Sequence, residues 1–270
     1  MIGKFFIFIE EHNEKGAYME KSKIVFIIAT SGFLVAVMSA LISMIAGLGT
    51  RFQWFHFRMG LELMGISALV GLVAAAISII AIVAIFFTPG NKGIYLCILG
   101  LIISIPVAAV PLYMRYEIKV PPIHDITTDT TNPPAFVYVL PLRKDAYNKP
   151  EYGGPDVAAQ QTKAYPDIKT LTLNMPPDKA FSRALDVAKN MSWEIVAAEP
   201  KERRIEATAT TFWMGFKDDI VIRITPQDKM SNIDIRSESR VGKSDLGANA
   251  QMRDTCLSLL FFIAINVISH

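Results

Sequence analysis

The sequence predicts three membrane-spanning helices followed by an α+β domain outside the bilayer. Mean hydropathy is +0.34, high for a soluble domain, and the long uncharged apolar runs are confined to the first half of the chain. The second half instead shows short segments that alternate between apolar and polar residues, as strands do. We therefore expect an N-terminal tail (1–23), a transmembrane region (24–114), a proline-rich joint and loop (115–166) and an external domain (167–270).

Each predicted span has the length and composition of a membrane helix. Residues 24–48 carry no charge, which is enough for a transmembrane helix of about 20 residues. The second span covers residues 61–87, with Glu62 at its edge, and the third covers residues 94–114. The third span contains two prolines, which a membrane helix tolerates with a kink. Small residues in the second span, such as Gly71, would allow close contact with another helix.

Three spans place the N-terminus and the external domain on opposite sides of the membrane. The lysines and arginines of the two sides nearly balance, but Lys21 and Lys23 immediately precede the first helix, which usually dominates orientation. This favours a cytoplasmic N-terminus. We expect a multi-pass protein of a bacterial inner membrane whose C-terminal domain is periplasmic.

The external domain is predicted to have the element order β-α-β-β-β-β-α. Residues 168–173 alternate as a strand, and two prolines open an amphipathic helix at residues 178–190. The later strands are residues 193–198, 204–213, 219–225 and 232–240, and a last helix spans residues 246 to about 268. This order predicts a mostly antiparallel sheet with its helices on one face. We expect residues 143–166 to form a polar loop, and the aromatic residues around Trp213 to lie in the core.

The strand-to-helix run at residues 231–250 is the first candidate site. Isoleucines fall on one face of the strand, which we expect to be packed, and charged residues fall on the other face, which we expect to be wet. Arginines near a helix N-terminus bind anions well. The predicted anion-binding residues are Arg236, Arg240, Lys243, Ser244 and Asp245. The alternative is a solvated face whose arginines pair with the acids beside them.

A second candidate site lies in the proline-rich joint. His124, Asp125 and Asp129 could supply an imidazole and two carboxylates, either to a metal or to a hydrolase. In the alternative interpretation these residues cap turns and anchor the joint. Because a second cluster of such residues is not found in the sequence, we predict no metal, no cofactor and no catalytic residues.

Two motifs resemble a known family. PPIHDITTD, followed by NPP, and the run IDIRSESRVGKSDLGANA are similar to the bacterial and plastid proteins of domain-of-unknown-function family 1499. The resemblance covers roughly residues 115–260, and the preceding spans resemble those of membrane-anchored members. The resemblance implies that a domain begins near residue 115 and that the two motifs belong together in it, but it implies no activity.

Charge and composition bear on nucleic-acid binding, on the cysteines and on the C-terminal tail. The first 114 residues hold seven basic and five acidic residues and the remainder holds twenty of each, so no basic patch for nucleic acid is predicted. Cys97 and Cys256 are expected to be free thiols. The tail at residues 257–269 is uncharged and too short to span a bilayer, so it must be buried elsewhere.

The sequence therefore favours a non-enzymatic, membrane-anchored binding or assembly protein. Its external domain would bind a partner protein, or an anionic lipid or metabolite. One alternative is a small accessory subunit of a larger membrane complex. The other is a membrane-tethered hydrolase that uses His124 and Asp125.

Overall fold

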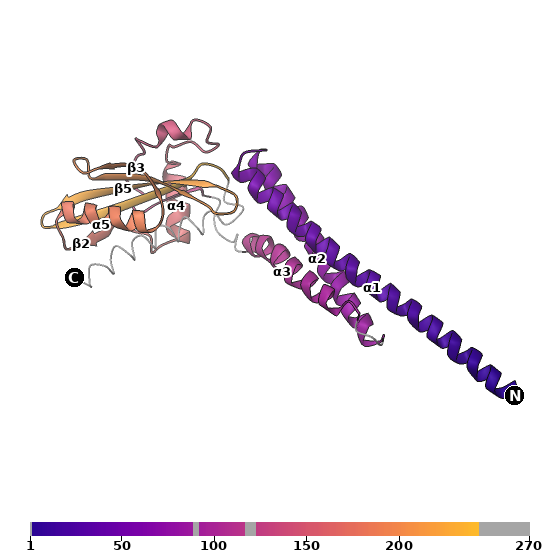
Figure 1. Cartoon of the computed structure of the whole chain (residues 1–270). Coiled ribbons are helices and arrows are strands. Elements are labelled where there is room, and N and C mark those ends of the chain that lie inside the picture. Colours follow the sequence, from indigo (N-terminus) through magenta and orange to yellow (C-terminus); the bar gives the residue numbers. More distant parts are fainter. Residues whose placement is uncertain (1, 89–91, 117–122, 243–270) are drawn as a thin grey trace. The chain divides into compact units, whose positions relative to one another are not determined.

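The computed structural model describes residues 2–88, 92–116 and 123–242. The chain divides into two compact units, Met1–Tyr113 and Met114–His270, which are considered separately. The first unit is helical and the second contains the sheet (Figure 1).

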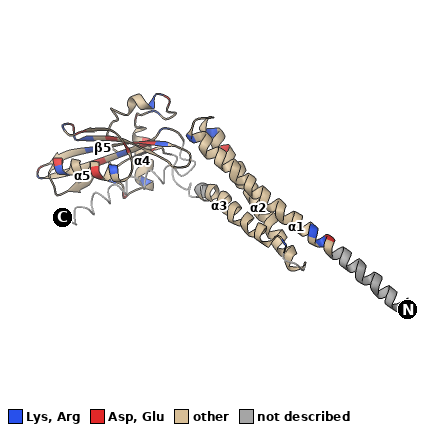
Figure 2. Ribbon diagram, in the orientation of Figure 1, with Lys and Arg blue, Asp and Glu red and all other residues tan. Residues whose placement is uncertain are grey.

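Three helices form the first unit: α1 (Ile2–Arg51), α2 (Phe57–Phe86) and α3 (Ile94–Tyr116). The segments Met19–Arg51, Phe57–Phe86 and Ile94–Tyr113 are long and apolar enough to cross a membrane. Figure 2 shows the contrast in charge, with few coloured residues along these helices and many in the sheet domain. The predicted spans are confirmed, although α1 also continues back through the predicted N-terminal tail.

Small residues bring the three helices into close contact. Seven of the eight buried residues of α2 recur every seven positions as two series along one side of the helix, and the eighth is Ala68. The series are Gly60, Ser67, Ala74 and Ala81, and Gly71, Ser78 and Ile85. A Cβ atom added at Gly32 of α1 or at Gly100 of α3 would lie within 3.0 Å of Ser78 Oγ. Gly71, which was expected to allow close contact with another helix, packs against α3 inside this bundle, and the free thiol Cys97 is buried there too.

The second unit is built on an antiparallel sheet with the strand order β1-β6-β5-β4-β3, in which β2 also pairs with β6. The strands are β1 (Asp125–Thr127), β2 (Leu171–Leu173), β3 (Glu194–Glu199), β4 (Arg204–Thr210), β5 (Lys217–Gln227) and β6 (Met230–Ser239). The strands β1 and β2 pair with different stretches of the same edge of β6.

The two faces of the sheet are covered in different ways. Helix α5 (Pro177–Asn190) packs its apolar side on one face, and α4 (Gly154–Ala164) contributes Val157 to the same hydrophobic core. The opposite face carries residues 128–153, which include the short 3-10 helix η1 (Leu140–Arg143) (Figure 1). We call residues 128–153 the covering segment. The predicted layout of a mostly antiparallel sheet with its helices on one face is confirmed.

Three local predictions need correction. The expected polar loop at residues 143–166 contains α4, which begins after Gly153 with proline in its first turn. The expected joint contributes β1 to the sheet. The strand predicted at residues 204–213 ends at Thr210, so Trp213 lies in a turn and is exposed rather than in the core. The predicted C-terminal helix and Cys256 lie outside the described residues.

Candidate functional site

Strand β6 presents alternate charged residues to the covering segment. Asp234, Arg236 and Glu238 point away from the helices, while the isoleucines between them lie in the hydrophobic core. All three charged side chains are buried, and Glu238 has no exposed surface. The prediction of a wet face is therefore wrong, because the covering segment excludes water and the charges pair with one another.

Arg236 is saturated by acceptors from the protein. Its Nε donates to Asp125 Oδ1 at 2.9 Å and its Nη2 donates to Asp125 Oδ2 at 2.7 Å, a two-point contact between strands β6 and β1. The same guanidinium donates to the carbonyls of Pro134 and Pro150 in the covering segment, and Nη2 lies 3.4 Å from Glu238 Oε2. Arg236 thus joins two strands and both ends of the covering segment.

Asp219 of β5 organises the neighbouring part of this face. Arg143 Nη1 lies 2.6 Å from Asp219 Oδ2, and Arg240 contacts both Asp219 oxygens at 2.8 Å. Thr208 Oγ1 also donates to Asp219. Arg143 Nη2 lies 3.0 Å from Glu238 Oε1, an ion-pair distance, but the geometry is not that of a hydrogen bond. We call Asp125, Arg143, Asp219, Arg236, Glu238 and Arg240 the buried ion cluster.

Burial changes the acidity of this cluster. It raises the pKa of Glu238 to about 8, and the charge of Asp125 acts in the same direction, whereas Arg143 and Arg236 lower that pKa. Burial also raises the pKa of Asp125, against the hydrogen bond from Arg236. Glu238 is therefore the member of the cluster that exchanges a proton at mildly alkaline pH.

Aromatic rings of the covering segment close over the arginines. The Phe136 ring centroid lies 4.7 Å from Arg236 Cζ and 5.6 Å from Arg143 Cζ, within the range of cation–π contacts. Tyr152 lies 5.6 Å from Arg236 on another side. Phe136 also packs on Val221 of β5, so the cluster is enclosed by apolar surface.

A carboxylate of β4 fixes the middle of the covering segment. Glu206 is fully buried and accepts hydrogen bonds from three consecutive backbone amides, those of Val137, Tyr138 and Val139, at 2.8 to 2.9 Å. Such amides would otherwise need water, and a carboxylate is a strong acceptor for them. Glu206 therefore ties this segment to the sheet.

Asp129 interacts with a different set of residues from His124 and Asp125. It lies 2.9 Å from Arg223 Nη2, which also contacts Asp234 at 2.8 Å. Its Oδ1 accepts from the amides of Thr131 and Asn132, which is the turn-capping role of our alternative interpretation. The structure therefore separates Asp129 from the cavity that His124 and Asp125 line.

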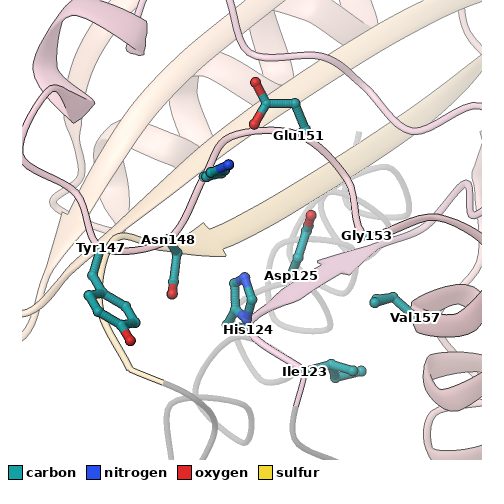
Figure 3. Close-up of a pocket in the computed structure, with 9 residues that line it drawn as sticks. Ile123, His124, Asp125, Tyr147, Asn148, Glu151, Gly153 and Val157 are labelled. Carbon is teal, nitrogen blue, oxygen red and sulfur yellow. The ribbon is translucent and has the colours of Figure 1, made fainter.

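A cavity of about 330 Å³ lies where β1 meets the covering segment (Figure 3). It is lined by Ile123, His124, Asp125, Tyr147, Asn148, Lys149, Glu151, Gly153 and Val157. Next to the cavity, the side-chain amide of Gln161 pairs with both backbone groups of Thr127, which attaches α4 to β1. Asn148 is likewise held, since its Nδ2 donates to the carbonyls of Ser239 and Gly242.

The structure brings together only some of the predicted site residues. Asp125 contacts Arg236 and lines the cavity beside His124, whereas Arg240 is bound to Asp219 and does not line it. The anion-binding role of Arg236 and Arg240 stays a prediction, and both guanidinium groups already have carboxylate partners. Lys243, Ser244 and Asp245 lie outside the described residues.

Sequence reasoning missed several residues that build this site. Asp219, Val221 and Arg223 alternate with the core residues Ile220 and Ile222, so the period-two argument applied to β6 would also have placed Asp219 and Arg223 on the charged face. No comparable pattern marks Arg143, which ends the short helix η1, or Lys149, which lies in irregular chain.

One comparison with known proteins gives a match. The sequence model of a family described as "Protein of unknown function (DUF1499)" matches residues 125–260, about half of the chain. The chain belongs to this family. The DUF1499 match starts at the first residue of β1, and it therefore contains every strand and the buried ion cluster. No curated protein matches the chain.

Proposed function

We propose that the protein is a membrane-anchored binding protein, not an enzyme, whose DUF1499 domain binds a small anionic ligand. It would serve as an assembly or envelope-maintenance factor of a bacterial inner membrane. The cavity beside β1 carries this proposal, because it places polar side chains, among them His124 and Lys149, next to the apolar side chains of Ile123 and Val157. Its volume is at the small end of ligand cavities, which span roughly 300–1,000 Å³.

The described residues that line the cavity include no unmatched acid, which supports an anionic ligand. The charge of Asp125 is matched by Arg236 directly behind it, and Lys149 balances Glu151. The imidazole of His124 and the carboxamide of Asn148 are further polar side chains of the lining. A carboxylate or phosphate on a short carbon skeleton would suit these groups.

The geometry is less suited to hydrolysis. A histidine base is commonly oriented by a carboxylate that accepts its second ring proton. Asp125 is the acid next to His124, and both of its oxygens accept from Arg236. These contacts support a structural role for Asp125 and favour binding over catalysis.

Ligand-induced stabilisation of the full chain in mild detergent tests the proposal. Inorganic phosphate, glycerol 3-phosphate and succinate serve as probes, and Trp193, which is buried in the core, reports unfolding of the domain. A probe at 100 times its Kd should stabilise the domain by about 2.7 kcal/mol. A preference for glycerol 3-phosphate over phosphate would indicate a lipid headgroup as the source.

The double variant His124→Gln, Lys149→Gln should lose this stabilisation. Lys144→Gln is the matched control, because Lys144 is exposed on the same segment but does not line the cavity. If no probe stabilises the wild type more than the double variant, the anionic-ligand assignment is wrong.

A further inference from the structure

The turn between β4 and β5 holds two aromatic side chains in solvent. Phe212 is 88% exposed and Trp213 is 40% exposed. The turn is well defined, since the Thr211 amide donates to the Phe216 carbonyl and the Phe216 amide donates to Thr211 Oγ1. Large aromatic rings in a rigid, exposed turn indicate a contact surface.

Two more exposed apolar side chains are fixed to the same end of the sheet. Arg240 makes the connection: its amide donates to the carbonyl of Lys217, the first residue of β5, and its Nη1 donates to the carbonyl of Leu142. The Arg240 carbonyl accepts a hydrogen bond from the amide of Asn148, the residue after Tyr147, so Tyr147 is held at this end of the sheet as well. Leu142 and Tyr147 are each 50% exposed. We call Leu142, Tyr147, Phe212 and Trp213 the aromatic tip.

The chain that follows the membrane-spanning helices enters the sheet at this same end. Asp125 pairs with Glu238, so β1 begins beside the C-terminal end of β6. That end of β6 pairs with the start of β5, directly after the turn that carries Phe212 and Trp213. The strand register thus places the aromatic tip at the end of the sheet where the chain from the membrane-spanning helices enters the domain.

The composition of the tip matches a bilayer interface. Tryptophan and tyrosine concentrate at the boundary between headgroups and acyl chains, and nearby lysines are attracted to anionic lipids. Lys144 and Lys149 are exposed on the covering segment that supplies Leu142 and Tyr147, but the exposed acids Asp145 and Glu151 balance their charge, so the match rests on the aromatic side chains. We propose that the aromatic tip inserts into the lipid interface of the membrane that anchors the chain. This inference does not rest on the ligand proposed for the cavity.

Quenching of tryptophan fluorescence by lipid tests this proposal in the full chain. The protein, carrying Trp54→Phe to remove the tryptophan between α1 and α2, is placed in nanodiscs whose acyl chains are brominated near the glycerol end. Trp213 should be quenched and its emission shifted to shorter wavelength, relative to nanodiscs of unbrominated lipid. The further variant Trp213→Phe should abolish the quenching, because Trp193 is buried in the domain core.

A second reporter position serves as a matched control. Lys229→Trp, added to Trp54→Phe and Trp213→Phe, places the probe in the exposed turn between β5 and β6, at the opposite end of the sheet. We expect this probe to be unquenched. Trp213 emission that is shifted but not quenched would mean that protein covers the tip, either the tail at residues 257–269 or a second copy. That result, or quenching no greater than at position 229, would overturn the proposal.

Discussion

Arg236 shows that the charged residues of β6 are buried together with their ion-pair partners. Its guanidinium is buried against Asp125 and Glu238. Breaking a buried ion pair leaves an uncompensated charge, which costs far more than an exposed pair contributes. We therefore expect the ion cluster to stabilise the folded domain, while the anion-binding role of Arg236 and Arg240 remains a prediction.

We expect Arg236→Gln to lower the free energy of unfolding by about 3 kcal/mol or more, because the buried Asp125 loses its ion-pair partner and Glu238 keeps only Arg143. Urea titration followed by Trp193 fluorescence measures this change. Arg203→Gln is the control, since Arg203 is 3.8 Å from the exposed Asp178 and should cost less than about 1 kcal/mol. Equal and small losses in the two variants would contradict the structural role of Arg236.

Glu238 should make the stability of the domain fall as the pH rises. Its pKa is raised to about 8 in the folded state, above the ordinary value of 4.5, so the folded protein binds more protons between these values. The stabilisation is complete below about pH 4.5 and is lost as the pH passes 8. Glu238→Gln cannot ionise, so its stability relative to the wild type should increase from pH 6 to pH 9. Parallel pH profiles of thermal unfolding would show that Glu238 does not titrate in this range.

At the scale of elements, a side chain of the sheet accepts hydrogen bonds from backbone amides of the covering segment, as a neighbouring strand would. Glu206 accepts three of its backbone amides. Glu206→Gln would direct an amide donor at these N–H groups, and a buried unsatisfied donor costs about 1–3 kcal/mol. We expect faster hydrogen exchange at residues 137–139 with little change in α5, measured by mass spectrometry. Unchanged exchange at residues 137–139 would refute the proposed attachment.

The elements that were predicted correctly have regular periodicity. The spans, α5 and the strands β3 to β6 could be recognised from uncharged runs or from period-two alternation. Helix α4 was missed because it has few apolar residues, of which Val157 and Ala164 pack against the core. The covering segment and β1 could not be recognised, because their hydrogen bonds go to partners far away in the sequence. Gln161, for example, completes β1 from a helix 34 residues further along the chain. The same limit applied to the candidate site, where His124 and Asp125 were found but Lys149 was not.

The sequence also did not predict which strand faces are buried. Alternation in β6 correctly divided its residues between two faces, but both faces are covered. The charges of one face suggested solvent, whereas they pair with arginines and acids contributed by β1, β5 and the covering segment. Charge alternation therefore identified the face, and only the tertiary structure identified its partners.

On the scale of the whole molecule, the three apolar helices define a testable orientation. Lys21 and Lys23 precede the first membrane-spanning segment, and three spans place the two ends of the chain on opposite sides. A reporter that is active only outside the cytoplasm should be active when fused after His270 and inactive when fused before the first span. The reverse pattern would place the DUF1499 domain in the cytoplasm.

Native mass spectrometry of the full chain, purified in mild detergent, tests the central claim most directly. If the cavity beside β1 is a ligand site, the wild type and Lys144→Gln should retain the same small molecule bearing a carboxylate or phosphate. The double variant His124→Gln, Lys149→Gln should lose it while keeping its folded charge-state distribution. Identical bound species in all three proteins, or none in the wild type, would contradict the account of a ligand-binding DUF1499 domain.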